Sequence, residues 1–337
     1  MFKRIVSIAL AGVLTVAMTA CAGKPQPTEL PTETTEPPVT QSPEEQKVEK
    51  ILIIGNSHSG DTFWQLQQVF DAHYDGEVVL GYLYYSGCTV GQHVKFAYGD
   101  QRVYIYRRNF TNNPDGGRWV EYKDADMKTA LLDQQWDTIV LQAGRADLDQ
   151  TLNQTGRRLL EDYVNQHIPT PHRFMWNRTW SNPTYEPFYN GEWRVKAPVG
   201  LKEQLTLLYG FNPATQFAQG TELVKKNILP DDTYEKILSP GTAIMYCILE
   251  KGMEDLEIYR DYTHLNDFGR LIAAYAFYTQ FTGQKVTEIK IDVIPAHLRS
   301  TRYIPEGDLV ITQEMKDTIL EAVNYAFDHP LEVPGQQ

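Results

Sequence analysis

The strongest constraint on the fold is an apolar, β-branched run that ends abruptly at a glycine. Residues 51–54 read Ile-Leu-Ile-Ile and are followed directly by Gly55-Asn56-Ser57. Such a run is typical of a strand buried on both faces, and the small residues after it predict a tight turn that leads into a helix. Open α/β folds bind their ligands at this end of a strand. The serine in the turn, next to the N–H groups of a helix start, is therefore a candidate nucleophile.

The N-terminus predicts export from the cytoplasm. A basic start and an apolar run within residues 1–20 are typical of a secretory signal, and the run is too short to favour a permanent membrane span. The sequence Met-Thr-Ala-Cys that ends at Cys21 resembles a bacterial lipobox. We therefore expect Cys21 to be lipidated and to anchor the protein on the extracytoplasmic face of the cell membrane. Cleavage nearby by an ordinary signal peptidase is the alternative.

Between this signal and the first strand lies a segment rich in Pro, Thr and Glu. Residues 21–48 cannot bury enough apolar surface to fold, and they predict an extended, disordered tether. Residues 49–331 are then long enough for one large domain. The net charge of −12 argues against nucleic acid as a partner. With Cys21 lipidated, only Cys88 and Cys247 remain to pair, and the sequence leaves that open. A monomer is the default expectation.

Apolar β-rich runs alternate with amphipathic runs through the predicted domain. This alternation predicts a parallel sheet covered by helices on both faces, and residues 103–122 predict an inserted hairpin around the turn at 112–117. The ligand-binding edge of the sheet should carry the residues at four strand ends, which are Ser57, Ser86–Cys88, Gln142–Asp147 and Asn177–Trp180.

A second group of chemically useful residues lies far along the chain, at Asp261-Tyr262-Thr263-His264-Leu265-Asn266. An Asp and a His three residues apart, just before a helix, can lie together on one loop. The carboxylate can then accept from one ring nitrogen while the other ring nitrogen faces a nucleophile. Alone, the pattern is more often a solvated loop or a helix cap. It gains weight from the serine at the turn after the first strand.

Two other motifs fit less well. Gly55-x4-Gly60-Asp61-Thr62 matches a phosphate loop except that Asp61 stands in place of the lysine, and a carboxylate there would repel phosphates. The run Gly55 to Ser59 approaches the G-x-S-x-G nucleophile elbow, but a serine replaces the second glycine. Ser59 is expected to cap the following helix rather than to react. The carboxylate of Asp61 in the phosphate-loop pattern therefore excludes nucleotide binding.

Together, Gly55-Asn56-Ser57, Gly87 and the Asp261-x-x-His264 block resemble the SGNH (GDSL-like) hydrolase family, and the chain resembles a poorly characterised bacterial lipoprotein branch of it. The resemblance implies a three-layer α/β/α flavodoxin-like fold with a central parallel sheet of about five strands and a hairpin insertion. It also implies metal-independent ester hydrolysis with no cofactor. Ser57 would be the nucleophile, His264 the base and Asp261 the residue that orients it. The N–H groups of Gly87 and Ser57 would donate to the oxyanion.

The chain departs from the family pattern at the third block. The family has Gly-x-Asn after the third parallel strand, and its Asn side chain donates to the oxyanion. Here the chain reads Gln142-Ala143-Gly144-Arg145, with no asparagine. Gln142 carries the same amide group and is the expected replacement, although it could equally do no more than hold a loop in place.

The remaining candidates are substrate contacts. His58 adjoins the nucleophile, and Arg145 could hold an acidic substrate group. Trp176, Asn177 and Trp180 follow a strand at the same edge, where aromatic rings and amides suit a sugar face. Packing in the core is, however, the more common role of a tryptophan.

The sequence thus predicts a tethered serine esterase that removes a small acyl group, most simply acetyl, from a carbohydrate or another small ester. Two alternatives stay open on the same fold. One is a glycan-binding lipoprotein with weak or no catalysis, and the other is an acyltransferase.

Overall fold

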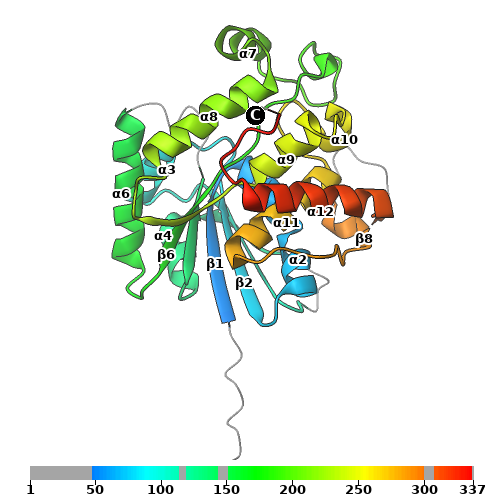
Figure 1. Cartoon of the computed structure of the whole chain (residues 1–337). Coiled ribbons are helices and arrows are strands. Elements are labelled where there is room, and N and C mark those ends of the chain that lie inside the picture. The colour runs from blue at the N-terminus through cyan, green and yellow to red at the C-terminus, as the bar shows by residue number, and fades with distance from the viewer. Residues whose placement is uncertain (1–47, 114–118, 143–150, 300–306, 336–337) are drawn as a thin grey trace, which may run out of the picture. The chain divides into compact units, whose positions relative to one another are not determined.

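A seven-stranded sheet in the order β4-β3-β2-β1-β5-β6-β7 forms the centre of the domain (Figure 1). The computed structural model describes residues 48–113, 119–142, 151–299 and 307–335. The strands of this sheet are β1 (Val48–Gly55), β2 (Glu77–Tyr84), β3 (Tyr104–Phe110), β4 (Val120–Ala125), β5 (Thr138–Leu141), β6 (Arg173–Asn177) and β7 (Tyr234–Leu238). β8 (Val293–Ile294) and β9 (Leu309–Val310) form a separate antiparallel pair.

Five strands of the sheet run parallel, from β2 through β1, β5 and β6 to β7. β3 and β4 are antiparallel and extend the sheet beyond β2. The expected five-stranded parallel sheet with an inserted hairpin is confirmed. Because β2 and β5 lie on opposite sides of β1, the strand order reverses at β1, and the carboxyl ends of β1 and β5 border the crevice where such sheets bind ligands.

Helices pack on both faces of the sheet. They are α1 (Ser57–Phe63), α2 (Leu66–His73), α3 (Val90–Tyr98), α4 (Met127–Asp133), α6 (Thr151–His167), α7 (Leu201–Tyr209), α8 (Pro213–Asn227), α9 (Pro240–Leu249), α10 (Asp255–Ile258), α11 (Asp267–Thr282) and α12 (Gln313–Asp328). The described residues also form two 3-10 turns, η1 (Glu186–Phe188) and η2 (Ala296–Leu298).

Side chains of β1 alternate between two separate cores, as the two-residue period of a strand requires. Ile51 and Ile53 pack with α1, α2, α9, α11 and α12 on one face. Leu52 and Ile54 pack with α3, α4 and α6 on the other. All four side chains are fully buried or nearly so. This double burial explains why the sequence of β1 is apolar without alternation, and it fixes where Ser57 emerges.

The helix after β1 begins earlier than the apolar pattern suggested. The helical spacing of Phe63, Leu66, Val69 and Phe70 predicts one helix over 63–72. In the structure α1 instead starts at Ser57, and a break at Trp64–Gln65 separates it from α2. Periodicity misses α1 because its first turn is small and polar.

The two cysteines of the described domain, Cys88 and Cys247, are both buried, and no disulfide joins them. No helix in the described ranges combines the length and apolar character needed to cross a bilayer. Cys21, the predicted signal at 1–20 and the predicted tether at 21–48 lie outside the described residues, apart from Val48 at the start of β1.

Gly81 in β2 is predicted to tolerate no side chain. A Cβ there would lie 2.5 Å from Trp136 Cη2 and 2.9 Å from Leu52 Cδ1, both in a packed core. We expect Gly81→Ala to lower the free energy of unfolding by about 1–3 kcal/mol through overpacking. Urea-induced unfolding followed by tryptophan fluorescence measures the loss.

Gly91 on α3 provides the matched control. It is exposed, and the nearest atom to an added Cβ is 4.0 Å away. Gly91→Ala should keep or raise stability, by up to about 1 kcal/mol, because alanine favours the helix. Equal effects of the two substitutions would contradict the packing argument.

Candidate functional site

The turn after β1 is held in place by hydrogen bonds on both sides of Ser57. Asn56 is the N-cap of α1, and its Oδ1 accepts from the backbone N–H of His58 at 3.1 Å. Its Nδ2 donates to the carbonyl of Cys88 at 3.1 Å, and the hydroxyl of Tyr82 donates to its carbonyl at 2.6 Å. Ser57 is therefore the first residue of a well-anchored helix, and it is partly exposed.

Asp261 and His264 lie together on a tight loop before α11. The loop is closed by a bridge between Tyr259 and Leu265. Asp261 Oδ1 accepts from the backbone N–H groups of Thr263 and His264 at 3.0 and 2.9 Å. His264 Nδ1 lies 2.9 Å from Asp261 Oδ2. The expected Asp–His pair thus exists, with Nδ1 occupied by the carboxylate and the imidazole partly exposed.

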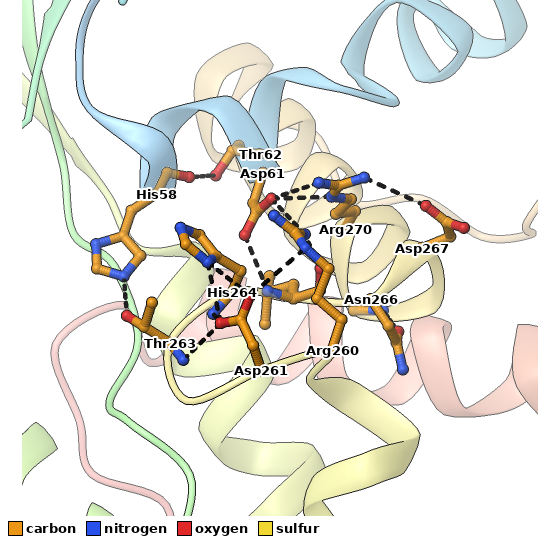
Figure 2. Close-up of polar contacts among 12 residues, drawn as sticks. His58, Asp61, Thr62, Arg260, Asp261, Thr263, His264, Asn266, Asp267 and Arg270 are labelled. Carbon is orange, nitrogen blue, oxygen red and sulfur yellow. Dashed lines mark hydrogen bonds and ion pairs between the residues drawn. The ribbon is translucent and has the colours of Figure 1, made fainter. Parts of the chain in front are cut away.

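A buried carboxylate one helical turn after Ser57 joins this loop to α1 (Figure 2). Asp61 is 2 % exposed. Its Oδ1 accepts from Arg260 Nη1 at 2.9 Å and from Arg270 Nε and Nη2 at 2.9 and 2.8 Å. Its Oδ2 accepts from the N–H of Leu265, next to the histidine, at 2.9 Å. The loop from Tyr259 to Leu265, called the base loop below because it carries the candidate base His264, is therefore docked on the helix that begins with Ser57.

In this network each carboxylate lies within ion-pair distance of an arginine. Burial by itself would raise the pKa of Asp61, but Arg260 and Arg270 outweigh it and hold this pKa well below its usual range. Arg270 also pairs with Asp267 at 3.3 Å, and Arg299 Nε pairs with the same carboxylate at 3.0 Å. Alternating charges extend in this way from α1 through α11 to the segment after η2.

His58 lies near the rings of His264 and Trp180. Its Nε2 is 2.9 Å from Thr263 Oγ1, and its ring is 6.2 Å from that of His264 and 5.3 Å from that of Trp180. Burial and the neighbouring His264 lower the pKa of His58 to about 4. His58 is therefore a neutral imidazole at neutral pH that contacts the base loop.

Beneath Ser57, a chain of polar side chains crosses from β5 to β6. Gln142 Oε1 accepts from the N–H of Asn56 and from Ser59 Oγ, both at 3.1 Å. Asn177 Nδ2 donates to the same Ser59 Oγ at 3.4 Å. Ser59 is fully buried, so the expectation that it caps the helix is wrong, and Asn56 takes that role.

Two polar atoms in this group of side chains lack a hydrogen-bond partner within the described residues. Among the described residues, Gln142 Nε2 and Asn177 Oδ1 have no hydrogen-bond partner although both are buried. Because the backbone N–H of Asn56 binds the amide oxygen of Gln142, Nε2 is the end of this amide that has no partner. Asn177 is 1 % exposed and belongs to the support of the turn.

Gly87 lies in a turn at the carboxyl end of β2, beside the end of β1. The N–H of Cys88 donates to the carbonyl of Tyr85 at 3.2 Å and closes the turn. Gly87 has φ +61°, and a Cβ on it would meet nothing within 4 Å. Glycine is therefore required by its backbone conformation and not by space.

The structure corrects two of the predicted substrate contacts, and a third is not among the described residues. Trp176 is 1 % exposed and packs in the core against Tyr234, so it offers no face to a sugar. Trp180 is 5 % exposed, and its Nε1 donates to the carbonyl of Thr263, so it supports the base loop. Arg145 lies outside the described residues.

The sequence reasoning missed Arg260 and Arg270 and used Asp61 only to reject a phosphate loop. A usable signal was present, because Asp61 follows Ser57 by four residues and therefore lies on the same side of a helix that starts there. No three His, Cys, Asp or Glu side chains gather as a metal site within the described part of the chain.

The chain resembles proteins of a family without an assigned function. Residues 50–187 match the family described as "Domain of unknown function (DUF4886)". A DUF4886 family protein from Bacteroides uniformis ATCC 8492 has a similar structure, with a TM-score of 0.65 and 24% sequence identity over 86% of this chain and 98% of that one. This likeness shows the fold. No curated protein matches the chain significantly.

A second solved structure is more distant. It is a catalytic mutant of an acetylxylan esterase from Geobacillus stearothermophilus, with a TM-score of 0.41 and 12% identity over 70% of this chain and 95% of that one. What the chain does must therefore be argued from its own site.

Removing the Asp61 carboxylate is predicted to destabilise the domain strongly. Asp61→Ala leaves buried Arg270 without its main partner, and we expect a loss of about 3–5 kcal/mol in the free energy of unfolding. Because the folded-state pKa of Asp61 lies below the unfolded value of about 3.9, its contribution is complete above that value and declines as the pH falls. Urea unfolding at pH 7 and pH 3 should show a smaller difference between wild type and variant at pH 3.

Asp328 offers a matched control, because its pair with Lys285 is solvent-exposed on both sides. Asp328→Ala should cost less than about 1 kcal/mol. If Asp61→Ala cost no more than this control, the proposed role of the buried network would be wrong.

Proposed function

We propose that this protein is a serine esterase of the SGNH type that uses Ser57, His264 and Asp261. The observation that carries the proposal is the docking of the Asp261–His264 loop on the first turns of the helix that begins with Ser57. This docking runs through Asp61 and is independent of any motif match. A serine, a histidine and a carboxylate that orients it are the parts that acyl transfer requires.

The chemistry follows from the partners of the imidazole. Asp261 accepts the Nδ1 proton of His264 and so leaves Nε2 as the base. Nε2 takes the proton of Ser57 as Oγ attacks the ester carbonyl, and then returns it to the departing alcohol. Water, activated by the same nitrogen, releases the acid from the acyl-enzyme and regenerates Ser57.

Three donors are proposed for the oxyanion. The N–H of Ser57 begins α1, and the N–H of Gly87 belongs to the exposed turn next to it. The third donor is Gln142 Nε2, which has no partner among the described residues. Preorganised donors of this kind stabilise the charge that develops on the carbonyl oxygen.

We propose a small acyl group, most simply acetyl, on a carbohydrate as the substrate. We further propose that Cys21 carries a lipid that anchors the domain on the extracytoplasmic face of the cell membrane. The lipobox-like end of the predicted signal supports the lipid anchor. No cofactor enters the mechanism.

Ser57→Ala is predicted to abolish esterase activity. Without the nucleophile, kcat for a chromogenic acetate ester should fall by roughly 10⁴-fold or more, while the unfolding midpoint stays the same because the side chain is partly exposed. Asp261→Asn should cost on the order of 10⁴-fold, since the tautomer of His264 is then wrong.

Ser59→Ala separates the two serines of the turn. A fluorophosphonate probe should label this variant and the wild type, and it should leave Ser57→Ala unlabelled. Wild-type turnover in Ser57→Ala would disprove the proposed mechanism.

The role of Gln142 can be tested separately. If Nε2 donates to the oxyanion, Gln142→Glu removes the donor but keeps an oxygen for Asn56 and Ser59, and kcat should fall by about 10²–10³-fold with KM little changed. Steady-state kinetics and thermal unfolding are measured together. A loss of stability with unchanged kcat would assign Gln142 to support of the turn alone.

One observation favours a second candidate. The chain lacks the family asparagine, and the amide oxygen of Gln142 is occupied with holding the turn. A glycan-binding lipoprotein with little or no catalysis is therefore the alternative, and an acyltransferase would use the same three residues. Absence of fluorophosphonate labelling, combined with glycan binding, would favour the binding protein.

A further inference from the structure

The segment after β6, residues 180–193, holds the base loop through hydrogen bonds that do not involve Asp61. The indole N–H at its start binds one loop carbonyl, as described above, and two further side chains bind two more. Asn182 Nδ2 donates to the carbonyl of Tyr262 at 2.8 Å, and Trp193 Nε1 donates to that of Arg260 at 2.7 Å. The three donors precede their acceptors by 67 to 83 residues, so these bonds form only in the folded domain.

The base loop takes donors from outside because its own N–H groups are used elsewhere. Those of Thr263 and His264 donate to the carboxylate of Asp261. That of Leu265 donates to Asp61. N–H groups that bind carboxylates cannot pair with carbonyls of the same loop, and backbone carbonyls in a folded domain need donors. The path of the loop is therefore set by two carboxylates on its N–H groups and by residues 180–193 on its carbonyls.

The amide of Asn182 is fixed in orientation by α8. Its Oδ1 accepts from Gln216 Nε2 at 2.7 Å, and its backbone N–H donates to Gln216 Oε1 at 3.0 Å. Because the amide oxygen is occupied in this way, Nδ2 is the end that binds the loop. Two residues further on, the N–H of Thr184 donates to Asp255 Oδ2 at 2.7 Å and ties the segment to α10. The amide is thus preorganised for the carbonyl of Tyr262.

The indole of Trp193 is fixed by packing against other rings. Its centroid lies 4.9 Å from that of Phe188 and 5.9 Å from that of Tyr185, and both contacts are edge-to-face. Phe188 is fully buried and packs edge-to-face on Tyr185 at 5.1 Å. Edge-to-face pairs are a favoured arrangement of aromatic side chains. The ring cluster therefore orients the N–H of Trp193 toward the base loop.

We propose that Asn182 and Trp193 are positioning residues of the active site, which hold the base loop so that His264 stays aligned with Ser57. The inference rests on the proposed function, because it takes His264 as the base. Both residues act through the backbone of the loop and need no contact with the ester. Loss of either donor should therefore loosen the loop and slow the reaction more than it weakens substrate binding.

Hydrogen exchange of the full-length protein, followed by mass spectrometry, tests the position of the loop without any substrate. Trp193→Phe keeps an aromatic ring and removes the N–H that binds the carbonyl of Arg260. Asn182→Ala removes the second donor. In each variant we expect the amides of residues 261–265 to exchange about tenfold faster, while those of β1 exchange as in the wild type, because only the loop opens more often.

Trp136→Phe is the matched control, because it makes the same chemical change in the other core. Trp136 is fully buried, and its Nε1 donates to the carbonyl of Ala130 at 2.8 Å. This variant should lose global stability, since a buried ring shrinks and a hydrogen bond is lost. It should leave the exchange of residues 261–265 unchanged relative to that of β1.

Turnover of a chromogenic acetate ester then connects the loop with the reaction. Trp193→Phe and Asn182→Ala should each lower kcat about tenfold with KM little changed, within the loss of about 10²-fold that a misplacement of about 1 Å can cause. Trp136→Phe should keep the wild-type kcat below its unfolding transition. If Trp193→Phe does not fold, the partly exposed Asn182 still decides the result.

The possible outcomes separate this inference from the esterase proposal. If the wild type hydrolyses no ester, the esterase proposal fails, and exchange alone decides whether the two residues hold the loop. Wild-type exchange over residues 261–265 in both variants would overturn the inference. Faster exchange of the loop together with wild-type kcat would also overturn it, because the two residues would then stabilise the loop without positioning the base.

Discussion

The site depends on one buried carboxylate. Asp61 forms ion pairs with two guanidinium groups and accepts a hydrogen bond from the N–H of the residue after His264. It therefore fixes the position of the base loop relative to α1. A carboxylate with 2 % exposure would be costly alone, and it is tolerated because every one of its contacts is a charge-assisted or backbone hydrogen bond. Replacing a whole buried ion cluster by apolar groups is often neutral for stability, so we assign this network to the geometry of the site more than to net stability.

The support of the serine turn is built in a different way. On the side of Asp61 the contacts are ionic, whereas on the side of β5 and β6 they are neutral amides and a hydroxyl, through Gln142, Ser59 and Asn177. Gly55 is required between them, because a Cβ there would lie 2.6 Å from Ser59 Oγ and 2.8 Å from Gln142 Oε1. The small residues after β1 therefore reflect close packing beneath the serine as well as the turn itself.

Much of the architecture could be predicted from the sequence. The apolar run of β1, the hairpin between β3 and β4, and the cap at Asn266 follow from local patterns with few competing interpretations. The Asp261–His264 pair could also be predicted, since three residues on one loop keep the two side chains within reach. For Trp176 and Trp180 the sequence left a sugar contact open beside core packing, because position at a strand end does not reveal whether a large ring points into the core. The roles of Arg260 and Arg270 could not be predicted from the sequence. Their partner, Asp61, lies 199 and 209 residues earlier, and local sequence patterns do not indicate such distant pairs.

That separation has a consequence for how the protein matures. The bonds that Asp61 makes to Arg260, Leu265 and Arg270 span 199, 204 and 209 residues. During synthesis β1 and α1 emerge first, and contacts of such long range form late because the closure entropy of the whole intervening chain must be overcome. The residues of the serine turn are therefore synthesised long before the loop that carries Asp261 and His264. A chain that stops before Tyr259 contains β1, α1 and Ser57, but none of the loop that docks on Asp61.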